Sequence, residues 1–219
     1  MCQLRDPNTF SNINDLATQH IALDLEVDFE PTRELEFKVL PRDENFGSAL
    51  QVDLQGIALG ESFQIKIKYE TTKEGGAIQF LDAKQTKGKA HPYLFSQCQI
   101  YARSMVPCQD TPSLKISYSA SITVPGQLTA LMSALSTGSE KLGDKTTFKF
   151  EQKNAIPSYL IALAVGNLAS KAISDRIAVW CEPEMLEAAA YEFSDAEQFM
   201  KIAEELTCPY EWGRYDLLM

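Results

Sequence analysis

The stretch His91–Pro112, HPYLFSQCQIYARSMVPCQDTP, is the part around which the chain is organised. Its first half alternates as a β-strand does, and its second half breaks into a turn bounded by prolines. The alternation predicts one face with Tyr93, Phe95, Gln97, Gln99 and Tyr101, and an opposite face with Leu94, Ser96, Cys98 and Ile100. Two neutral amides between aromatic rings are unusual in a strand, because a buried amide must find partners or cost about 1–3 kcal/mol.

Two interpretations of this amide pair remain open on the residues alone. Gln97 and Gln99 could be a buried pair that satisfies neighbouring backbone groups, or they could recognise a polar ligand group. In the second case a neutral amide oxygen accepts a hydrogen bond from an ammonium without forming a strong ion pair. The spacing does not decide between the two.

The other polar residues of this stretch favour structural roles. Cys98 lies on the face opposite the amides with no nearby histidine, which favours a buried, inert thiol over a nucleophile. His91 precedes Pro92, so it is expected in an extended turn with a hydrogen-bonding role. Asp110 lies in the turn PCQDTP and is expected to accept backbone N–H bonds that fix this turn.

Charge and composition exclude several classes of protein. The chain has 219 residues and a net charge of −10, which argues against a nucleic-acid partner. The segment Glu182–Asp216 contains ten acids against Lys201 and Arg214, a pattern that favours a solvated acidic face. The polar start MCQLRDPNTF does not resemble a signal peptide, and the apolar run Ile156–Ala169 is too short to span a membrane. We expect a cytoplasmic protein with reduced thiols and no membrane contact.

Alternating apolar residues predict an all-β fold, a β-sandwich or saddle-shaped sheet, with a short C-terminal helical segment. The helical part shows the capping pattern Ser194-x-x-Glu197. We expect one domain over residues 1–181, and over residues 182–219 a helical hairpin and the first strand of another domain. Ser136–Asp144 is rich in Gly and Ser and is predicted to be a turn. Strands are predicted at His20–Phe29, Leu35–Val39, Leu50–Leu54, Phe63–Tyr69, Tyr93–Tyr101, Leu114–Val124, Thr146–Gln152, Tyr159–Leu168, Ile177–Cys181 and Tyr215–Met219.

The sequence contains no assembled catalytic motif. HExxH, GxSxG, the P-loop and GxGxxG are absent, and no pair of cysteines has zinc-ligand spacing. We therefore assign no catalytic residue, no metal ligand and no cofactor to these 219 residues.

Several blocks together resemble a known family. HPYLFSQCQ, VPCQDTPSLKISYSASITVP, LTALMSA, IPSYLIALAVGNL, YEFSDAEQFMKIAEEL and PYEWGRYDLLM resemble the N-terminal domain of leukotriene A4 hydrolase-like zinc aminopeptidases, peptidase family M1. The resemblance covers about Thr18–Met219, and its QCQ and PCQDTP blocks are specific.

The resemblance implies a saddle-like β-domain that packs against a thermolysin-like zinc domain of the same polypeptide. By position, Gln99, with Gln97 beside it, would hold the free α-amino group of a peptide substrate. The zinc ligands and the general base of the family would lie beyond Met219, so these residues alone are expected to be inert. The parent enzyme would remove N-terminal residues from peptides, with a leukotriene epoxide as a further substrate.

One region departs from the family. The connection from Phe37 to Leu50 is shorter than in the family by about two strands, which would leave a sheet edge missing or rebuilt. A hypothesis of another class is a free-standing, non-catalytic β-sandwich that binds partners through the surface that otherwise meets the zinc domain.

Overall fold

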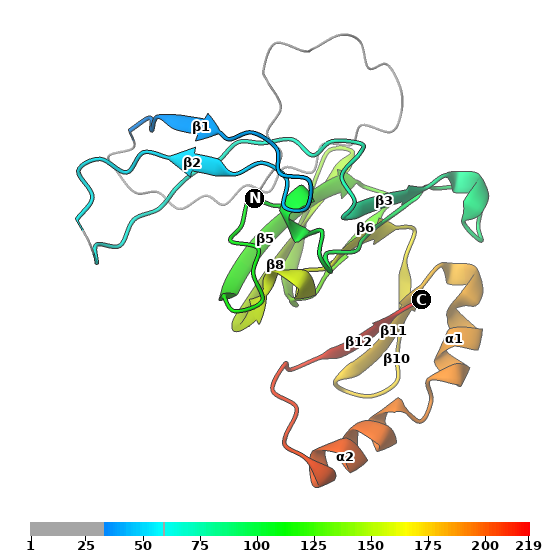
Figure 1. The fold of residues 1–219 in the computed structure, drawn as a ribbon. Coiled ribbons are helices and arrows are strands. Elements are labelled where there is room, and N and C mark those ends of the chain that lie inside the picture. Colours follow the sequence, from blue (N-terminus) through cyan, green and yellow to red (C-terminus); the bar gives the residue numbers. More distant parts are fainter. Residues whose placement is uncertain (1–32, 59) are drawn as a thin grey trace.

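The computed structural model describes residues 33–58 and 60–219, so the predicted strand His20–Phe29 lies outside the described residues. Strands dominate the described part, and two helices, α1 (Leu186–Glu192) and α2 (Ala196–Leu206), lie near its C-terminus (Figure 1). The strands are β1 Phe37–Val39, β2 Leu50–Val52, β3 Ile78–Leu81, β4 Tyr93–Ser96, β5 Lys115–Pro125, β6 Thr129–Met132, β7 Leu135–Leu142, β8 Lys145–Pro157, β9 Leu163–Gly166, β10 Ala169–Ala172, β11 Ile177–Cys181 and β12 Tyr215–Leu218.

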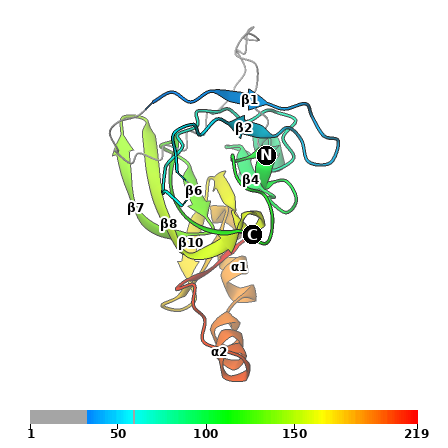
Figure 2. The ribbon, with the colours of Figure 1, turned by 60° about the vertical axis from the view of Figure 1, so that its left-hand side comes forward.

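The main core lies between a three-stranded sheet ordered β5-β8-β7 and a four-stranded sheet ordered β3-β4-β9-β6. Alternation in β5 turns Ile122 and Val124 inward, where they meet Leu94 of β4 and Val165 of β9 in one buried cluster. The strands β7 and β8 run side by side as a long, curved antiparallel pair (Figure 2). These sheets confirm the prediction of an all-β, saddle-like sandwich.

A smaller sheet follows the sandwich, with β10 antiparallel and β12 parallel to the central strand β11. Parallel neighbours need a crossover connection, and α1 and α2 supply it. α1 covers one face of this sheet, where Ala189 packs with Val179 and Cys181 in a second buried cluster. The predicted strands Ile177–Cys181 and Tyr215–Met219 and the short C-terminal helical segment are confirmed. Neither helix of the described part has the length and apolar composition that crossing a membrane requires.

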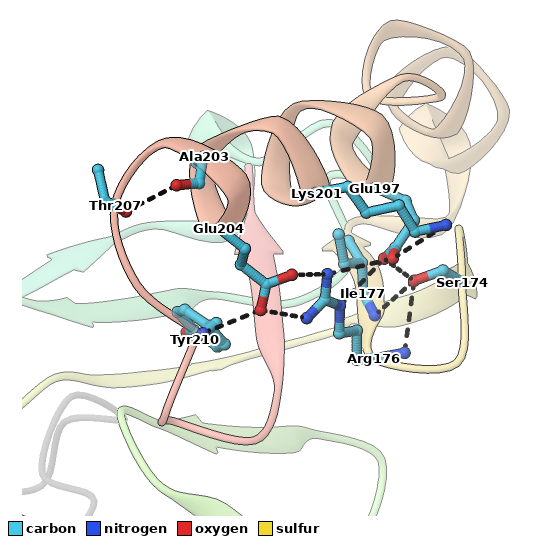
Figure 3. Close-up of polar contacts among 9 residues, drawn as sticks. All are labelled: Ser174, Arg176, Ile177, Glu197, Lys201, Ala203, Glu204, Thr207 and Tyr210. Carbon is cyan, nitrogen blue, oxygen red and sulfur yellow. Dashed lines mark hydrogen bonds and ion pairs between the residues drawn. The ribbon is translucent and has the colours of Figure 1, made fainter.

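Helix α2 is attached to the rest of the protein by an ion-pair network around Arg176 (Figure 3). Two guanidinium nitrogens of Arg176 donate to the two carboxylate oxygens of Glu204 over 2.8 and 2.7 Å. Glu197 accepts from Ser174 Oγ over 2.7 Å and from Arg176 Nε over 3.3 Å. The predicted capping box is wrong in this respect: Asp195, not Ser194, is the N-cap, and Glu197 reaches Ser174 and Arg176.

Two segments differ from the sequence predictions because strand formation depends on a partner. Ser136–Asp144 lies mostly in β7, whose Ser139 and Glu140 pair with Phe148 and Thr147 of β8. The turn is confined to Gly143, at φ +62°, and Asp144. Pairing with β8 therefore overrides the weak intrinsic strand preference of Ser and Gly.

Phe63–Tyr69 alternates as predicted but is not a strand, and the side chains of Phe63 and Ile65 are 48% and 40% exposed. Among the described residues no strand pairs with it. The alternation of apolar residues provides an apolar face for a strand. A strand also needs a neighbouring strand with which its backbone forms hydrogen bonds. The sequence also missed three strands of four residues each, β3, β6 and β10.

The connection from Phe37 to Leu50 forms a closed hairpin. Strands β1 and β2 pair antiparallel with Val39 opposite Leu50, and the N–H of Leu40 donates to the carbonyl of Ala49 over 2.8 Å. A bridge between Asp43 and Gly47 closes the tip. The two strands form a separate two-stranded sheet.

Candidate substrate-binding site

Strand β4 ends at Ser96, just before the two glutamines, so the predicted strand to Tyr101 is wrong beyond this residue. The end of the strand is fixed on both sides. The N–H of Leu163 in β9 donates to Ser96 Oγ over 2.7 Å, and the N–H of Gln97 donates to the carbonyl of Ala77 over 2.7 Å. The backbone that carries Gln97 is therefore held by two neighbouring segments.

The segment after β4 alternates in exposure: Gln97 and Gln99 are exposed, and Cys98 between them is 3% exposed. The carbonyl of Cys98 accepts hydrogen bonds from the N–H groups of Tyr101 and Ala102, each over 3.0 Å. Cys98 thus anchors the turn through its buried side chain and its backbone carbonyl. Both amides face solvent on the side opposite Cys98, as the alternation predicted. Neither glutamine side chain hydrogen-bonds to another of the described residues.

Cys98 behaves as the sequence predicts for a buried thiol. Its Sγ lies 3.9 Å from the Sδ of Met105 in a cluster with Ala77, Ala102 and Ile161. Burial raises the pKa of the Cys98 thiol to about 11, so the thiol is protonated at neutral pH. Because the thiolate is the nucleophilic form, the protonated thiol of Cys98 is unreactive as a nucleophile.

Ile100 is the residue that sequence reasoning placed wrongly. The strand pattern puts it on the inner face with Cys98, but its side chain is 72% exposed and its φ is +61°. Left-handed backbone is strained for a β-branched residue, because its side chain crowds the neighbouring carbonyl. The turn therefore stores strain directly after Gln99, which is typical of functional sites.

We expect Ile100→Gly to raise the free energy of unfolding by about 0.5–1 kcal/mol, because glycine adopts this φ without strain and little buried surface is lost. Urea denaturation of the 219-residue chain measures the change. Ile100→Val keeps the branched Cβ and is expected to bring no gain. A loss of stability in Ile100→Gly would mean that the side chain of Ile100 packs on its surroundings.

The turn of the PCQDTP block is fixed by Asp110, whose side chain is 9% exposed. Its Oδ2 accepts from the backbone N–H and from the Nε of Arg103, over 3.2 and 2.6 Å, and its Oδ1 accepts from Ser158 Oγ over 2.5 Å. Arg103 also donates to the backbone carbonyls of Asp110 and Phe46 over 3.3 and 3.2 Å. Asp110 thus ties the segment after the glutamines to the end of β8.

The prediction for Asp110 is therefore correct in kind, since the carboxylate accepts a backbone N–H. Its main partners, Arg103 and Ser158, were missed. Ser158 lies 48 positions away in the chain, and no local pattern connects it with Asp110. The spacing of Arg103 and Asp110 across a Pro-bounded turn was the available signal for the ion pair.

His91 has a backbone role in this structure: its carbonyl accepts from the hydroxyl of Thr86 over 3.1 Å. The other histidine, His20, lies outside the described residues. Within residues 33–58 and 60–219, no group of three or more His, Cys, Asp or Glu side chains is placed to hold a metal ion. The described residues therefore do not fit a zinc site.

An apolar cavity of about 160 Å³ is lined among others by Met105, Cys108, Ile116 and Leu163. Gln97 and Gln99 do not line it. Its lining offers few polar groups, so it does not suit a charged ligand. The exposed amide pair is the better candidate for recognising a polar group.

The chain was compared with known proteins. The family described as "Peptidase M1 N-terminal domain" matches residues 9–160. Leukotriene A-4 hydrolase of Xenopus laevis is 36% identical over 257 aligned positions, which cover 99% of this chain and 42% of the relative. Leucine aminopeptidase 2-2 of Meyerozyma guilliermondii is 42% identical over 199 positions, covering 90% of this chain and 30% of the relative.

Solved structures agree with these relatives. Native leukotriene A4 hydrolase from Saccharomyces cerevisiae superposes with a TM-score of 0.71 at 34% identity, over 92% of this chain and 30% of that one. An M1 zinc metallopeptidase from Deinococcus radiodurans bound to a Tyr-Ser-Ala substrate has a TM-score of 0.51 at 19% identity, over 57% of this chain and 31% of that one, and so shares the fold.

The match to the Xenopus relative is 38 positions longer than this chain, so the relative has residues without a counterpart here. The chain also spans less than half the length of the relatives it matches. Since the family matches residues 9–160 and the similarity to a full relative covers almost every residue, this chain belongs to peptidase family M1 and carries its N-terminal domain.

Proposed function

We propose that this chain is the N-terminal domain, as a fragment or a short form, of a leukotriene A4 hydrolase-like zinc aminopeptidase that removes N-terminal residues from peptides. The observation that carries the proposal is similarity over 99% of the chain to a relative of which it spans 42%. In this proposal, residues 1–181 form the β-domain, and residues 182–219 begin the zinc domain. Zinc would be held by residues outside this sequence.

Within that enzyme, we assign Gln97 and Gln99 to binding the ammonium group of the peptide N-terminus. Their amides are exposed, have no side-chain partner among the described residues, and stand on a turn that Cys98, Ser96 and Ala77 hold in place. A carboxamide oxygen accepts from an ammonium, and a fixed backbone lowers the entropy cost of holding it there.

The 219 residues alone are proposed to be inert as a peptidase. The described residues offer no metal cluster, and the thiol of Cys98 is protonated and buried. The amide pair supplies orientation of a substrate, and orientation without a nucleophile does not cleave a peptide bond. Among the described residues, Cys98, Cys181 and Cys208 are free thiols, which supports our assignment to the cytoplasm.

Peptides with and without a free N-terminus test the proposal. The protein purified from its source cells is incubated with a leucine-tipped tripeptide and with the same peptide acetylated at its N-terminus. We expect leucine release from the free peptide and none from the acetylated one, because acetylation removes the ammonium. The recombinant 219-residue chain should cleave neither. Equal cleavage of both peptides, or cleavage by the 219-residue chain, would contradict the proposal.

A free-standing binding module remains the second candidate, and the exposed apolar residues of helix α2 favour it. The mass of the native product separates the two candidates. A product of 24.4 kDa would be this chain itself, whereas a larger product would contain it as a domain.

A further inference from the structure

The apolar cavity of about 160 Å³ lies where two parts of the hydrophobic core meet. Part of its wall, including Ile122, belongs to the cluster between the two sheets of the sandwich. Another part, including Met105, belongs to the cluster around Cys98. Three more wall residues pack against both clusters: Ile78, Tyr118 and Met132. The cavity is therefore a space between the two clusters and not a defect within one of them.

Strand β5 explains why this space is not filled. β5 pairs with β8 along one edge, and among the described residues no strand pairs with its other edge. Its register against β8 shifts between Ile116 and Tyr118, and both residues line the cavity. Tyr69 and Thr71 also line it, from a segment that forms no strand. The irregular pairing bends β5, and no ladder of hydrogen bonds draws that segment against it, so the side chains between them do not close-pack.

The wall of the cavity is apolar in its chemistry. The hydroxyl of Tyr118 shares a hydrogen bond of 3.0 Å with Ser133 Oγ, so its polar atom already has a partner. Burial raises the pKa of Tyr118, so the phenol is neutral at neutral pH. Ser119 and Ser121 alternate with Tyr118 and Ala120, so their side chains belong to the other face of β5. A charged ligand would lose its hydration here without gaining new partners.

The volume of the cavity sets the size of a ligand. A cavity of about 150 Å³ lined by Leu, Ile and Phe in another protein stays dry and binds benzene, and the volume here is similar. Water fits such a space poorly, because a buried water needs about two to four polar partners. Met105 and Met132 add flexible, polarisable side chains that adapt to the shape of an aromatic ring.

We propose that this cavity, which we call the β5 cavity, binds one small uncharged apolar molecule, such as a single aromatic ring or a short alkyl chain. Its wall is partly open, with the exposed side chains of Ile116 and Thr71 among its residues, so a ligand can enter the folded chain. The site uses no residue outside this sequence. It is therefore independent of the proposed peptidase function, and its failure would leave that function standing.

Benzene added to the 219-residue chain, isotope-labelled at its methionine methyl groups, tests the site by NMR. A bound aromatic ring shifts the signals of nuclei close to it. We expect the methyl signals of Met105 and Met132 to move with benzene concentration and to reach a plateau. Met200 and Met219 do not line the cavity, so their signals should stay in place. No movement at Met105 and Met132, or equal movement at all four methionines, would overturn the site.

Benzoate is the matched control ligand, because it has the same ring and a negative charge. We expect it to bind about tenfold more weakly than benzene or not at all. Benzene should also raise the melting temperature of the chain by a few degrees, since it binds the folded state alone, whereas benzoate should not. Equal binding of the two molecules would contradict an apolar ligand class and overturn the proposal.

A variant pair places the ligand in the cavity. Ala120, which is 7% exposed and lines the cavity, is replaced in Ala120→Leu by a side chain that occupies the space of the ligand. We expect this variant to lose the benzene-induced shifts. The control Ala172→Leu, at an exposed position of β10, should keep them. Unchanged benzene binding in Ala120→Leu would overturn the site. If Ala120→Leu does not fold, the signals of Met105 and Met132 in the wild type decide by themselves.

Discussion

Asp110→Ala is expected to lower the free energy of unfolding of the 219-residue chain by about 3 kcal/mol. The carboxylate is 9% exposed and accepts from the backbone and guanidinium of Arg103 and from the hydroxyl of Ser158. Removing it leaves a guanidinium that is 20% exposed without its anion, and a hydroxyl on a residue that is 3% exposed without its acceptor. Urea denaturation followed by tryptophan fluorescence measures the loss.

The matched control is Glu140→Ala, which breaks an exposed ion pair. Glu140 and Lys149 are 71% and 53% exposed and 3.6 Å apart, so its loss should change stability by less than about 0.5 kcal/mol. If both variants lose the same amount, the Asp110 network does not stabilise the turn.

The effect of Asp110 also depends on pH. Burial opposes ionisation of Asp110, but hydrogen bonds from Ser158 and Arg103 outweigh it, so the pKa lies below the ordinary value of 3.8. The unfolded chain therefore binds this proton more readily than the folded chain. The stabilisation is complete above pH 3.8 and is lost as the pH falls through the folded pKa. The difference between wild type and Asp110→Ala should shrink correspondingly below pH 3.8.

Gln99→Leu in the longer enzyme is expected to lower kcat/KM for peptides about 10- to 100-fold, which corresponds to about 1–3 kcal/mol of lost transition-state stabilisation. The leucine keeps the size of the side chain but cannot accept a hydrogen bond from the substrate ammonium. Steady-state kinetics on a leucine-tipped tripeptide measure the effect. Because Gln99 is exposed, the melting temperature should not change.

Two further variants show whether the amide acts by hydrogen bonding. Gln99→Asn keeps a carboxamide on a shorter stem and should lose less than Gln99→Leu. Gln97→Leu tests the neighbouring amide, which precedes Cys98 in the sequence. An unchanged kcat/KM in Gln99→Leu would show that this glutamine does not bind the substrate.

Some parts of the fold were predicted correctly because one buried face specifies them. The alternation of Ile122 and Val124 located β5, and the pattern Ser194-x-x-Glu197 located the start of α2 to within a residue. β7 was missed because its residues are all exposed, so its sequence has no alternation of apolar residues that would predict a strand. The strand state of β7 comes from its pairing with β8, which no local pattern contains.

Alternation placed Gln97 and Gln99 on the same side, opposite Cys98, and the structure shows both glutamines exposed and Cys98 buried, whereas their role in binding a substrate stays a prediction. The end of β4 at Ser96 was not predictable from that alternation. The strand end depends on two hydrogen bonds with residues that are distant in the sequence: the N–H of Gln97 donates to the carbonyl of Ala77, and the N–H of Leu163 donates to Ser96 Oγ. The positive φ of Ile100 could not be predicted from the sequence either, because a β-branched residue normally favours extended backbone.

The parallel pairing of β11 with β12 has a consequence for the order of folding. The β10-β11 hairpin is local in sequence, whereas β12 reaches β11 only after both helices have been made. Closing that longer loop costs more chain entropy and is slower. During synthesis, one edge of β11, with its unpaired amides and carbonyls, therefore stays open while the sandwich is already complete. That interval is when the chain is most exposed to wrong strand pairing and aggregation.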